Sequence, residues 1–371
     1  MRLFGAWHAV PVSTSLRRGW TTGACATAAT KAAVTALLTG AFPDPVQITL
    51  PKGHTPAFAL TQTGLTGDTA MAAIVKDAGD DPDVTHGAVI RSTVRHGVPG
   101  SGVTFRAGKG VGTVTKPGLP LPVGEPAINP VPRQLIQQVI AETGAADIIV
   151  EISVDGGEEL ARRTWNPRLG ILGGLSILGT TGVVVPYSCS AWIDSIRRGV
   201  DVARAAGRQH VAACTGSTSE KAVTELYGLP EDALLDMGDF AGAVLKYLRR
   251  HPVPRLTIAG GFAKLSKLAD GHLDLHSGRS QVDLASLARR THNKELAERI
   301  TNANTALEAL QLAQKAGDPL ADAVADAARE QAQEVLRGAP VEVDVLVINR
   351  TGQPVGHAPR STDGCPETTT P

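Results

Sequence analysis

The sequence predicts a mixed α/β protein of two domains and a tail. We expect an α+β domain over residues 1–165 and a doubly wound, mostly parallel α/β domain over residues 166–350. Three observations support this. The chain has 371 residues, which suits two domains better than one. Its first half sets one alanine-rich segment among short β-rich runs. Its second half alternates such runs with helical segments, as parallel sheets require. The Gly-, Pro- and Thr-rich tail, 351–371, is expected to be disordered.

The first half contains two expected helices and six expected strands. The alanine-rich segment 22–38 predicts a helix that ends at Gly40. Pro132 opens a second helix over 133–142, after an extended proline-rich stretch from 117 to 132. Strands are expected at 46–50, 57–61, 70–76, 87–94, 103–107 and 147–154.

The second half predicts a repeating order of strands and helices. Strands are expected at 183–185, 210–214, 233–236, 255–259 and 341–348. Helices are expected at 190–206, 219–227, 240–250 and 263–268, with Ser219 as the N-cap of the second. Residues 286–338 should be almost wholly helical, with a break at 317–319.

Composition excludes several classes of protein. Lysine plus arginine and aspartate plus glutamate both total 36, so there is no basic excess for general nucleic-acid binding. No apolar run approaches the roughly 20 residues of a membrane span, and the first residues do not form a secretory signal. Four scattered cysteines make no CxxC pair, which argues against a zinc site or a disulfide framework. We expect a cytoplasmic protein.

The helix expected at 22–38 has polar residues at its start. Thr21 and Thr22 stand where hydroxyls cap a helix, followed by Gly23. Free N–H groups at such a start attract carboxylates or phosphates, and Arg17 and Arg18 precede it. From these residues alone, an ordinary N-cap behind solvated arginines is the simpler interpretation.

Four carboxylates lie within residues 77–83, namely Asp77, Asp80, Asp81 and Asp83. A calcium loop beginning at Asp81 fails, because its sixth position is His86 and its twelfth is Ser92. The segment is either a solvated turn or a loop in which one or two aspartates face a ligand.

A glycine-rich run follows, with five glycines spread over residues 170–182. Glycine fills a core poorly, so the run suggests a buried loop where a ligand approaches the backbone. Gly173, Gly174, Thr180, Thr181 and Gly182 are the candidate contacts. The spacing is neither GxGxxG nor a GxxxxGK[ST] phosphate loop, and a plain interdomain linker is the alternative.

Two further loops follow expected strands. Thr215, Gly216 and Ser217 come after 210–214, and Gly260 and Gly261 come after 255–259. Ligands of open α/β sheets sit beyond the carboxyl ends of strands, although ordinary βα turns have similar residues. After these loops come Lys264, His272 and His276. A zinc site is a poor interpretation, because Asp274 is the one possible third ligand nearby. Carboxylate binding or proton transfer is the better interpretation, and a surface loop is the alternative.

Four blocks, at residues 16–33, 75–88, 165–187 and 260–277, occur in one order in this chain. Together they resemble the cobalt-precorrin-5B C(1)-methyltransferase family of cobalamin biosynthesis. The resemblance implies that a methyl group passes from S-adenosyl-L-methionine to C1 of a cobalt-containing tetrapyrrole, giving cobalt-precorrin-6A. Cobalt would arrive within the substrate, so no protein-bound metal is expected.

The resemblance, which favours function for the aspartate-rich segment but for no single aspartate, and the positions of the loops together predict roles for the candidate residues. Asp77, Asp80 and Asp81 are the catalytic candidates. Substrate carboxylates would meet Arg17, Arg18, Thr21, Thr22, Gly23, Lys264, His272 and His276. The cofactor would meet Gly173, Gly174, Thr180, Thr181, Gly182, Thr215, Gly216, Ser217, Gly260 and Gly261. Two alternatives stay open: a non-catalytic tetrapyrrole carrier, and another small-molecule transferase on the same scaffold. No nucleic acid or membrane partner is expected, and a homo-oligomer is allowed.

Overall fold

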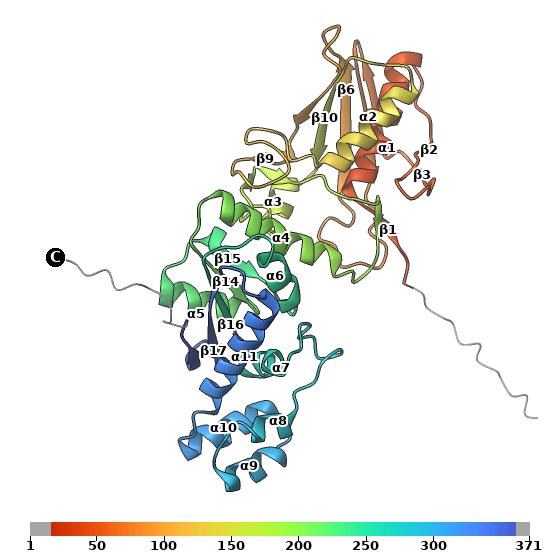
Figure 1. Cartoon of the computed structure of the whole chain (residues 1–371). Coiled ribbons are helices and arrows are strands. Elements are labelled where there is room, and N and C mark those ends of the chain that lie inside the picture. Colours follow the sequence, from red (N-terminus) through yellow and green to blue (C-terminus); the bar gives the residue numbers. More distant parts are fainter. Residues whose placement is uncertain (1–15, 361–371) are drawn as a thin grey trace, which may run out of the picture. The chain divides into compact units, whose positions relative to one another are not determined.

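The computed structural model of the chain describes residues 16–360, which form two compact units (Figure 1). Unit 1 takes the described residues up to Val114 together with Gly124–Pro167 and Ile171–Ser188. Unit 2 takes Thr115–Val123, Arg168–Gly170 and the described residues from Cys189 onward. The chain therefore crosses between the units several times, where the sequence suggested a single boundary near residue 165.

Unit 1 is built on a five-stranded sheet in the order β4-β5-β6-β10-β7. Neighbouring strands are antiparallel except β10 and β7, which run parallel. The strands are β4 (Gln62–Thr66), β5 (Thr69–Val75), β6 (Val89–His96), β7 (Val103–Ala107) and β10 (Ile148–Val154). Strand β4 was not predicted, because it is an edge strand with no buried residue and so lacks the alternation that marks a half-buried strand.

Two helices pack against each other in unit 1, and α1 also packs on β5 and β6 (Figure 1). Helix α1 (Thr22–Thr39) begins at the N-cap Thr21, whose hydroxyl accepts a hydrogen bond from the N–H of Ala24, and ends at the left-handed Gly40. Its alanines are small enough for close approach to the sheet, which explains how a chain with 4% aromatic residues builds this core. Helix α2 (Pro130–Glu142) begins three residues before the predicted start at 133, because the first turn of a helix accepts proline and holds both Pro130 and Pro132.

Short strand pairs connect the glycine-rich run to the rest of unit 1. The runs expected at 46–50 and 57–61 shrink to two-residue strands. The pairs are β1 (Gly19–Trp20) with β13 (Val183–Val184), β2 (Val46–Gln47) with β3 (Ala57–Phe58), β8 (Gly110–Val111) with β12 (Gly174–Leu175), and β9 (Thr113–Val114) with β11 (Ile171–Leu172). A short helix, α3 (Gly157–Ala161), follows β10.

Unit 2 contains a second five-stranded sheet, in the order β15-β14-β16-β17-β18. Its strands are β14 (His210–Cys214), β15 (Leu234–Asp236), β16 (Arg255–Gly261), β17 (Glu342–Ile348) and β18 (Pro354–Ala358). The first four in the spatial order are parallel and β18 is antiparallel to β17. The expected disorder from 351 is therefore wrong for β18, which hydrogen-bonds to the sheet edge; residues 361–371 lie outside the described part.

Helices cover both faces of this sheet, which confirms the doubly wound prediction. Helix α5 (Ser217–Tyr227) packs on one face, against Ala212, Cys214 and Ala259. On the other face, α4 (Ser190–Ala205), α6 (Ala241–Leu248), α7 (Phe262–Ala269) and α11 (Leu320–Leu336) pack against the alternating residues Val211, Ala213 and Ile258. Ser219 is not the N-cap of α5: the helix begins at Ser217 after Gly216, and the Ser219 hydroxyl donates to the Gly216 carbonyl instead.

The segment predicted to be one long helical region is four helices. These are α8 (Leu284–Ala288), α9 (Lys294–Thr301), α10 (Ala306–Ala316) and α11, and a 3-10 turn, η1 (Glu231–Ala233), precedes β15. The break at Gly317 is confirmed, and two more occur where the Asn293 and Thr305 side chains cap α9 and α10. Within residues 16–360, no helix is both long and apolar enough to cross a bilayer.

Candidate active site

Three segments of unit 1 meet and form what we call the three-segment cluster: residues 17–20, 77–81 and 182–187. The Trp20 N–H donates to the Asp77 carbonyl at 2.7 Å, and β1 pairs with β13. The contact is too close for side chains at two positions. A Cβ on Gly19 would lie 2.0 Å from the Ala78 carbonyl carbon, and one on Gly79 would lie 2.1 Å from the Arg17 oxygen.

Arg17 is held by two of the candidate aspartates. Its guanidinium makes two hydrogen bonds to the Asp77 carboxylate, and its backbone N–H donates to Asp80 Oδ2 at 2.6 Å. The hydrogen bond from Arg17 and a further one from the Gly79 N–H lower the pKa of Asp77 to about 2. Asp77 is therefore a stable anion at neutral pH and an unsuitable general base.

The aspartate-rich segment is a closed loop with its own internal ion pair. Lys76, whose side chain is 2% exposed, donates to Asp83 Oδ2 at 2.7 Å, and backbone hydrogen bonds join Lys76 to Gly87 and Ala88. Asp81 Oδ1 accepts the Tyr187 N–H at 2.8 Å. Asp77, Asp80 and Asp81 thus all bind groups of their own chain.

The residues at the start of α1 bind the glycine-rich run. The N–H of Gly23 and the hydroxyl of Thr22 both donate to the Leu178 carbonyl, and the Thr21 N–H donates to the Gly182 carbonyl. These groups are therefore already occupied. Arg18 differs, since it is exposed and forms no ion pair with any carboxylate of residues 16–360.

Most glycines of the run serve internal packing. A Cβ on Gly174 would lie 2.3 Å from the backbone of Gly110, and one on Gly182 would lie 2.5 Å from the Leu50 side chain. Gly173, with a φ of 86°, has open space instead. Thr180 is exposed, and the Thr181 hydroxyl donates to the Val183 carbonyl. The run offers open backbone at Gly173 rather than along its whole length.

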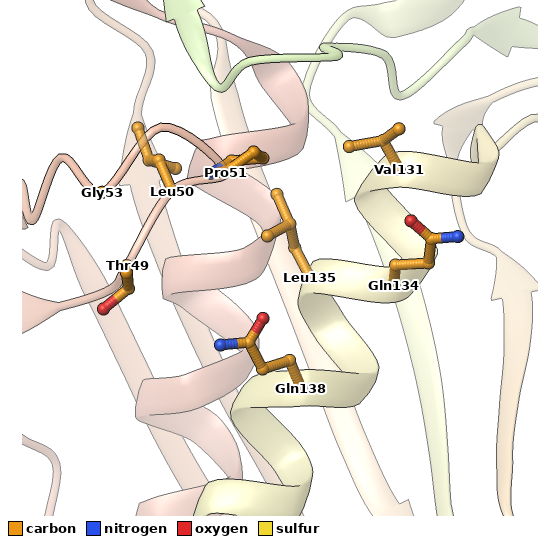
Figure 2. A pocket seen from close by; sticks show the side chains of 8 residues that line it. All are labelled: Thr49, Leu50, Pro51, Gly53, Val131, Gln134, Leu135 and Gln138. Atoms are coloured by element: carbon orange, nitrogen blue, oxygen red, sulfur yellow. The ribbon is translucent and has the colours of Figure 1, made fainter.

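Unit 1 has a surface hollow of about 430 Å³ beside α2 (Figure 2). Its lining is apolar apart from one hydroxyl and two amides: Thr49, Leu50, Pro51 and Gly53 come from the loop after β2, and Val131, Gln134, Leu135 and Gln138 from α2. None of the candidate residues lines this hollow, and none of its lining side chains is titratable. The hollow therefore offers no charged group to bind substrate carboxylates and no acid or base for proton transfer.

A second hollow, of about 410 Å³, borders the three-segment cluster. Trp20 and Asp77 line it together with Phe58, Leu60 and Ile74. The Trp20 and Phe58 rings meet edge to face at 5.7 Å. This hollow joins an apolar floor to the anionic Asp77, and it is of the size that small-molecule sites have.

In unit 2 the chain reverses direction across the sheet between β14 and β16. From β14 it passes through α5 to β15 on one side, and then through α6 to β16 on the other side of β14. Ligands of such sheets bind at this point, beyond the carboxyl ends of the strands. Thr215 and Gly216 follow β14 directly, Gly260 and Gly261 end β16, and the Thr215 N–H donates to the Ala259 carbonyl.

The carboxyl ends of β14 and β16, at residues 215–217 and 260–261, have open backbone, and we call this place the strand-end site. A Cβ added at Gly216 or Gly261 would meet nothing within 4 Å, whereas one on Gly260 would lie 2.6 Å from the Thr215 side chain. Helices α5 and α7 start here with no side-chain capping hydrogen bond, and Ser217 is the first residue of α5. Free N–H groups at these starts suit an anionic or polar ligand.

The remaining candidates of unit 2 lie close to the strand-end site or in the loop after α7. Lys264 Nζ lies 3.0 Å from Asp239 Oδ1 and 3.2 Å from the Thr215 carbonyl. The His272 N–H donates to the Lys267 carbonyl, and His276 Nδ1 accepts the Gly278 N–H. Within residues 16–360, no three His, Cys, Asp or Glu side chains gather as a metal site would need.

Three polar residues at the carboxyl edge of the sheet were not predicted from the sequence. Arg168 makes a two-pronged ion pair with the buried Glu220, at 2.6 and 2.8 Å. Asp236 ends β15; burial, with the neighbouring charge of Glu220, raises its pKa. Asp236 comes about 20 residues after Gly216, the spacing at which an acidic residue meets a ribose in dinucleotide-binding βαβ units. That spacing is a sequence signal that could have identified it.

The candidate residues thus fall into two groups. Unit 1 holds Arg17, Arg18, Thr21, Thr22, Gly23, Asp77, Asp80, Asp81, Gly173, Gly174, Thr180, Thr181 and Gly182. Unit 2 holds Thr215, Gly216, Ser217, Gly260, Gly261, Lys264, His272 and His276. The parallel sheet of unit 2 and the open backbone at its strand ends define an α/β protein of the class whose members bind small molecules there.

Comparison with known proteins identifies the family. The CbiD family matches residues 10–186, and the C-terminal domain of CbiD matches residues 274–359. A curated cobalt-precorrin-5B C(1)-methyltransferase of Paramagnetospirillum magneticum is 62% identical over 353 residues, which cover 93% of this chain and 98% of that protein. Another, from Brucella anthropi, is 65% identical over 91% of this chain and 94% of its own length. The chain belongs to the CbiD family.

A solved structure is also similar in sequence. The crystal structure of a cobalamin biosynthesis protein from Archaeoglobus fulgidus is 27% identical, covers 67% of this chain and 77% of its own, and gives a TM-score of 0.38. At that TM-score no position is transferred from it.

Proposed function

We propose that this protein is an S-adenosylmethionine-dependent methyltransferase that methylates C1 of cobalt-precorrin-5B to give cobalt-precorrin-6A in cobalamin biosynthesis. The observation that carries the proposal is the identity of 62% and 65% to curated proteins of that name, over more than nine-tenths of this chain. A cytoplasmic location and a homo-oligomeric state stay predictions.

We assign the cofactor to the strand-end site of unit 2. Open backbone at Gly216 and Gly261 and uncapped helix starts suit the polar parts of S-adenosylmethionine. Asp236 is suited to accept hydrogen bonds from ribose hydroxyls. Lys264, expected to bind substrate, contacts Thr215 and Asp239, and we assign it to ordering the strand-end site instead.

We assign the substrate to the three-segment cluster of unit 1. Arg17 is held by Asp77 and Asp80, whereas Arg18 makes no ion pair within the described residues, so we assign Arg18 to a substrate carboxylate. The three candidate aspartates then act by ordering this surface. Gly173 is the position of the glycine-rich run that has open backbone for a ligand, and His272 and His276 stay candidates for substrate carboxylates.

The reaction requires positioning more than a strong base. The methyl donor supplies an electrophilic methyl carbon on a sulfonium: a bond forms from C1 to that carbon, the sulfur–carbon bond breaks, and its electron pair stays on sulfur. The positive charge disappears as the methyl leaves, so carboxylates pressed against the sulfonium would stabilise the ground state more than the transition state.

Calorimetry with S-adenosylhomocysteine tests the proposal, together with conversion of cobalt-precorrin-5B using labelled methyl donor. Gly261→Val should weaken binding of S-adenosylhomocysteine at least tenfold and leave the melting temperature nearly unchanged, since its backbone is extended and the space is open. Gly64→Val, on an exposed strand with only Met71 nearby, is the control. If the wild-type protein binds the tetrapyrrole but binds neither S-adenosylhomocysteine nor the methyl donor, the proposal is wrong and the protein is a tetrapyrrole carrier.

A further inference from the structure

Tyr187 adopts a backbone conformation that its side chain disfavours. Residues 185–188 form a tight turn, closed by a hydrogen bond of 3.1 Å from the Ser188 N–H to the Val185 carbonyl. Pro186 occupies the second position of the turn, which its fixed φ suits. Tyr187 occupies the third position with a φ of 57°, in the left-handed region where glycine or asparagine is normal. A bulky aromatic residue there stores strain, and such strain concentrates at functional positions.

The aspartate-rich loop holds the strained residue in place. Asp81 Oδ1 accepts the Tyr187 N–H at 2.8 Å, across 106 residues of sequence. The neighbouring Asp80 accepts the Arg17 N–H, so the same loop fixes both edges of the cluster. A charged acceptor strengthens such a hydrogen bond. The bond to Asp81 therefore favours the backbone conformation in which the Tyr187 N–H points to the aspartate-rich loop.

The strained turn presents an aromatic side chain to solvent. Tyr187 is 68% exposed, and Val185, two residues before it, is 47% exposed. Gly19 pairs with Val184, so Arg18 and Val185 come next on the two strands. An exposed ring, an exposed aliphatic side chain and the guanidinium of Arg18, which has no ion pair within residues 16–360, therefore belong to one short stretch of surface. That combination suits a flat, apolar molecule with carboxylates at its rim.

We propose that the Tyr187 ring contacts the face of the tetrapyrrole macrocycle, and that Asp81 is a positioning residue that holds Tyr187 for this contact. The identity of the macrocycle rests on the proposed function. The assignment moves Asp81 from the methyl-transfer chemistry to the recognition of substrate. It also explains why a strained tyrosine occupies position 187, since a glycine there would fit the turn but would present no ring.

Tyr187→Gly separates recognition from folding. Glycine relieves the strain, so the melting temperature should rise or stay equal while the dissociation constant for cobalt-precorrin-5B, measured by visible absorbance, rises at least tenfold. Tyr187→Phe keeps the ring and should restore binding to within about threefold of wild type. Val98→Gly removes an exposed side chain elsewhere on unit 1 and is the matched control.

Asp81→Ala should weaken macrocycle binding by a similar factor, and the double variant with Tyr187→Gly should be no worse than either single variant, because the two residues act as one unit. Equal macrocycle affinity for Tyr187→Gly and wild type would overturn the inference, and the turn would then serve only the passage into unit 2. Wild-type protein that binds the macrocycle through Tyr187 but transfers no methyl group would overturn the proposed function and leave this inference standing.

Discussion

Replacing Arg18 with alanine should weaken substrate binding without disturbing the fold. Its guanidinium forms no ion pair with any other described residue, so its loss should change the free energy of unfolding by less than about 0.5 kcal/mol. A charge-assisted contact to a substrate carboxylate is worth about 1.5–3 kcal/mol. Converted at about 1.4 kcal/mol per factor of ten, this predicts a KM for cobalt-precorrin-5B raised about 10- to 150-fold.

If the contact is equally strong in the ground and transition states, kcat should hardly change. Steady-state kinetics at two salt concentrations, with S-adenosylhomocysteine affinity measured in parallel, give the answer. Arg106→Ala, which removes another exposed arginine of unit 1, controls for general loss of positive charge. A weaker cofactor affinity with an unaltered KM would mean that substrate and cofactor are assigned to the wrong units, and an equal effect of Arg106→Ala would refute a specific contact.

Three further changes test the interpretation of the site. Asp83→Ala leaves the Lys76 ammonium buried without its carboxylate and should lower the free energy of unfolding by about 3–5 kcal/mol in denaturant titrations. Burial favours the neutral acid, but attraction by Lys76 and hydrogen bonds lower the pKa of Asp83 overall. The contribution of Asp83 to stability is therefore present above the unfolded pKa of about 3.9 and should be lost as the pH falls below that value. The variant should not show this loss. Asp236→Asn removes a carboxyl group whose pKa burial raises, so it should stabilise the free protein at pH 7 in thermal melts while weakening S-adenosylhomocysteine binding; no change in binding would remove Asp236 from the cofactor site. Gly79→Ala, which places a Cβ against the Arg17 carbonyl, should raise KM and lower the melting temperature together; unchanged values would show that the segments do not pack this closely.

The sequence predicted the larger elements because their signals are local. Apolar runs bounded by glycine marked β14 and β16, and the alanine-rich segment after Thr21 marked α1. The antiparallel edge strand β18 escaped, because its glycine and proline suggest a turn and its partner β17 supplies the hydrogen bonds. Edge strands stabilised by one neighbour have weak signals of their own.

The candidate site was harder to predict, because residue types do not reveal their partners. The glycines of the run 170–182 suggested ligand contact, but Gly174 and Gly182 are glycine because Gly110 and Leu50 fill the space beside them. Three aspartates suggested catalysis, yet each accepts hydrogen bonds from distant parts of its own chain. The left-handed Tyr187 had no sequence signal at all, since tyrosine is not expected in that conformation.

The scarcity of aromatic residues has a spectroscopic consequence. Trp20 lies in the three-segment cluster against Phe58, and the Trp192 indole N–H donates to the carbonyl of Asp236 at the carboxyl edge of the unit 2 sheet. With four tryptophans in the whole chain, intrinsic emission excited at long ultraviolet wavelengths comes from few positions. Each unit therefore contains its own fluorophore beside the place assigned to its ligand. A coloured macrocycle at the Trp20 end would quench by energy transfer, while a colourless cofactor product at the Trp192 end would shift the emission without absorbing it, so the two binding events have separable optical signatures.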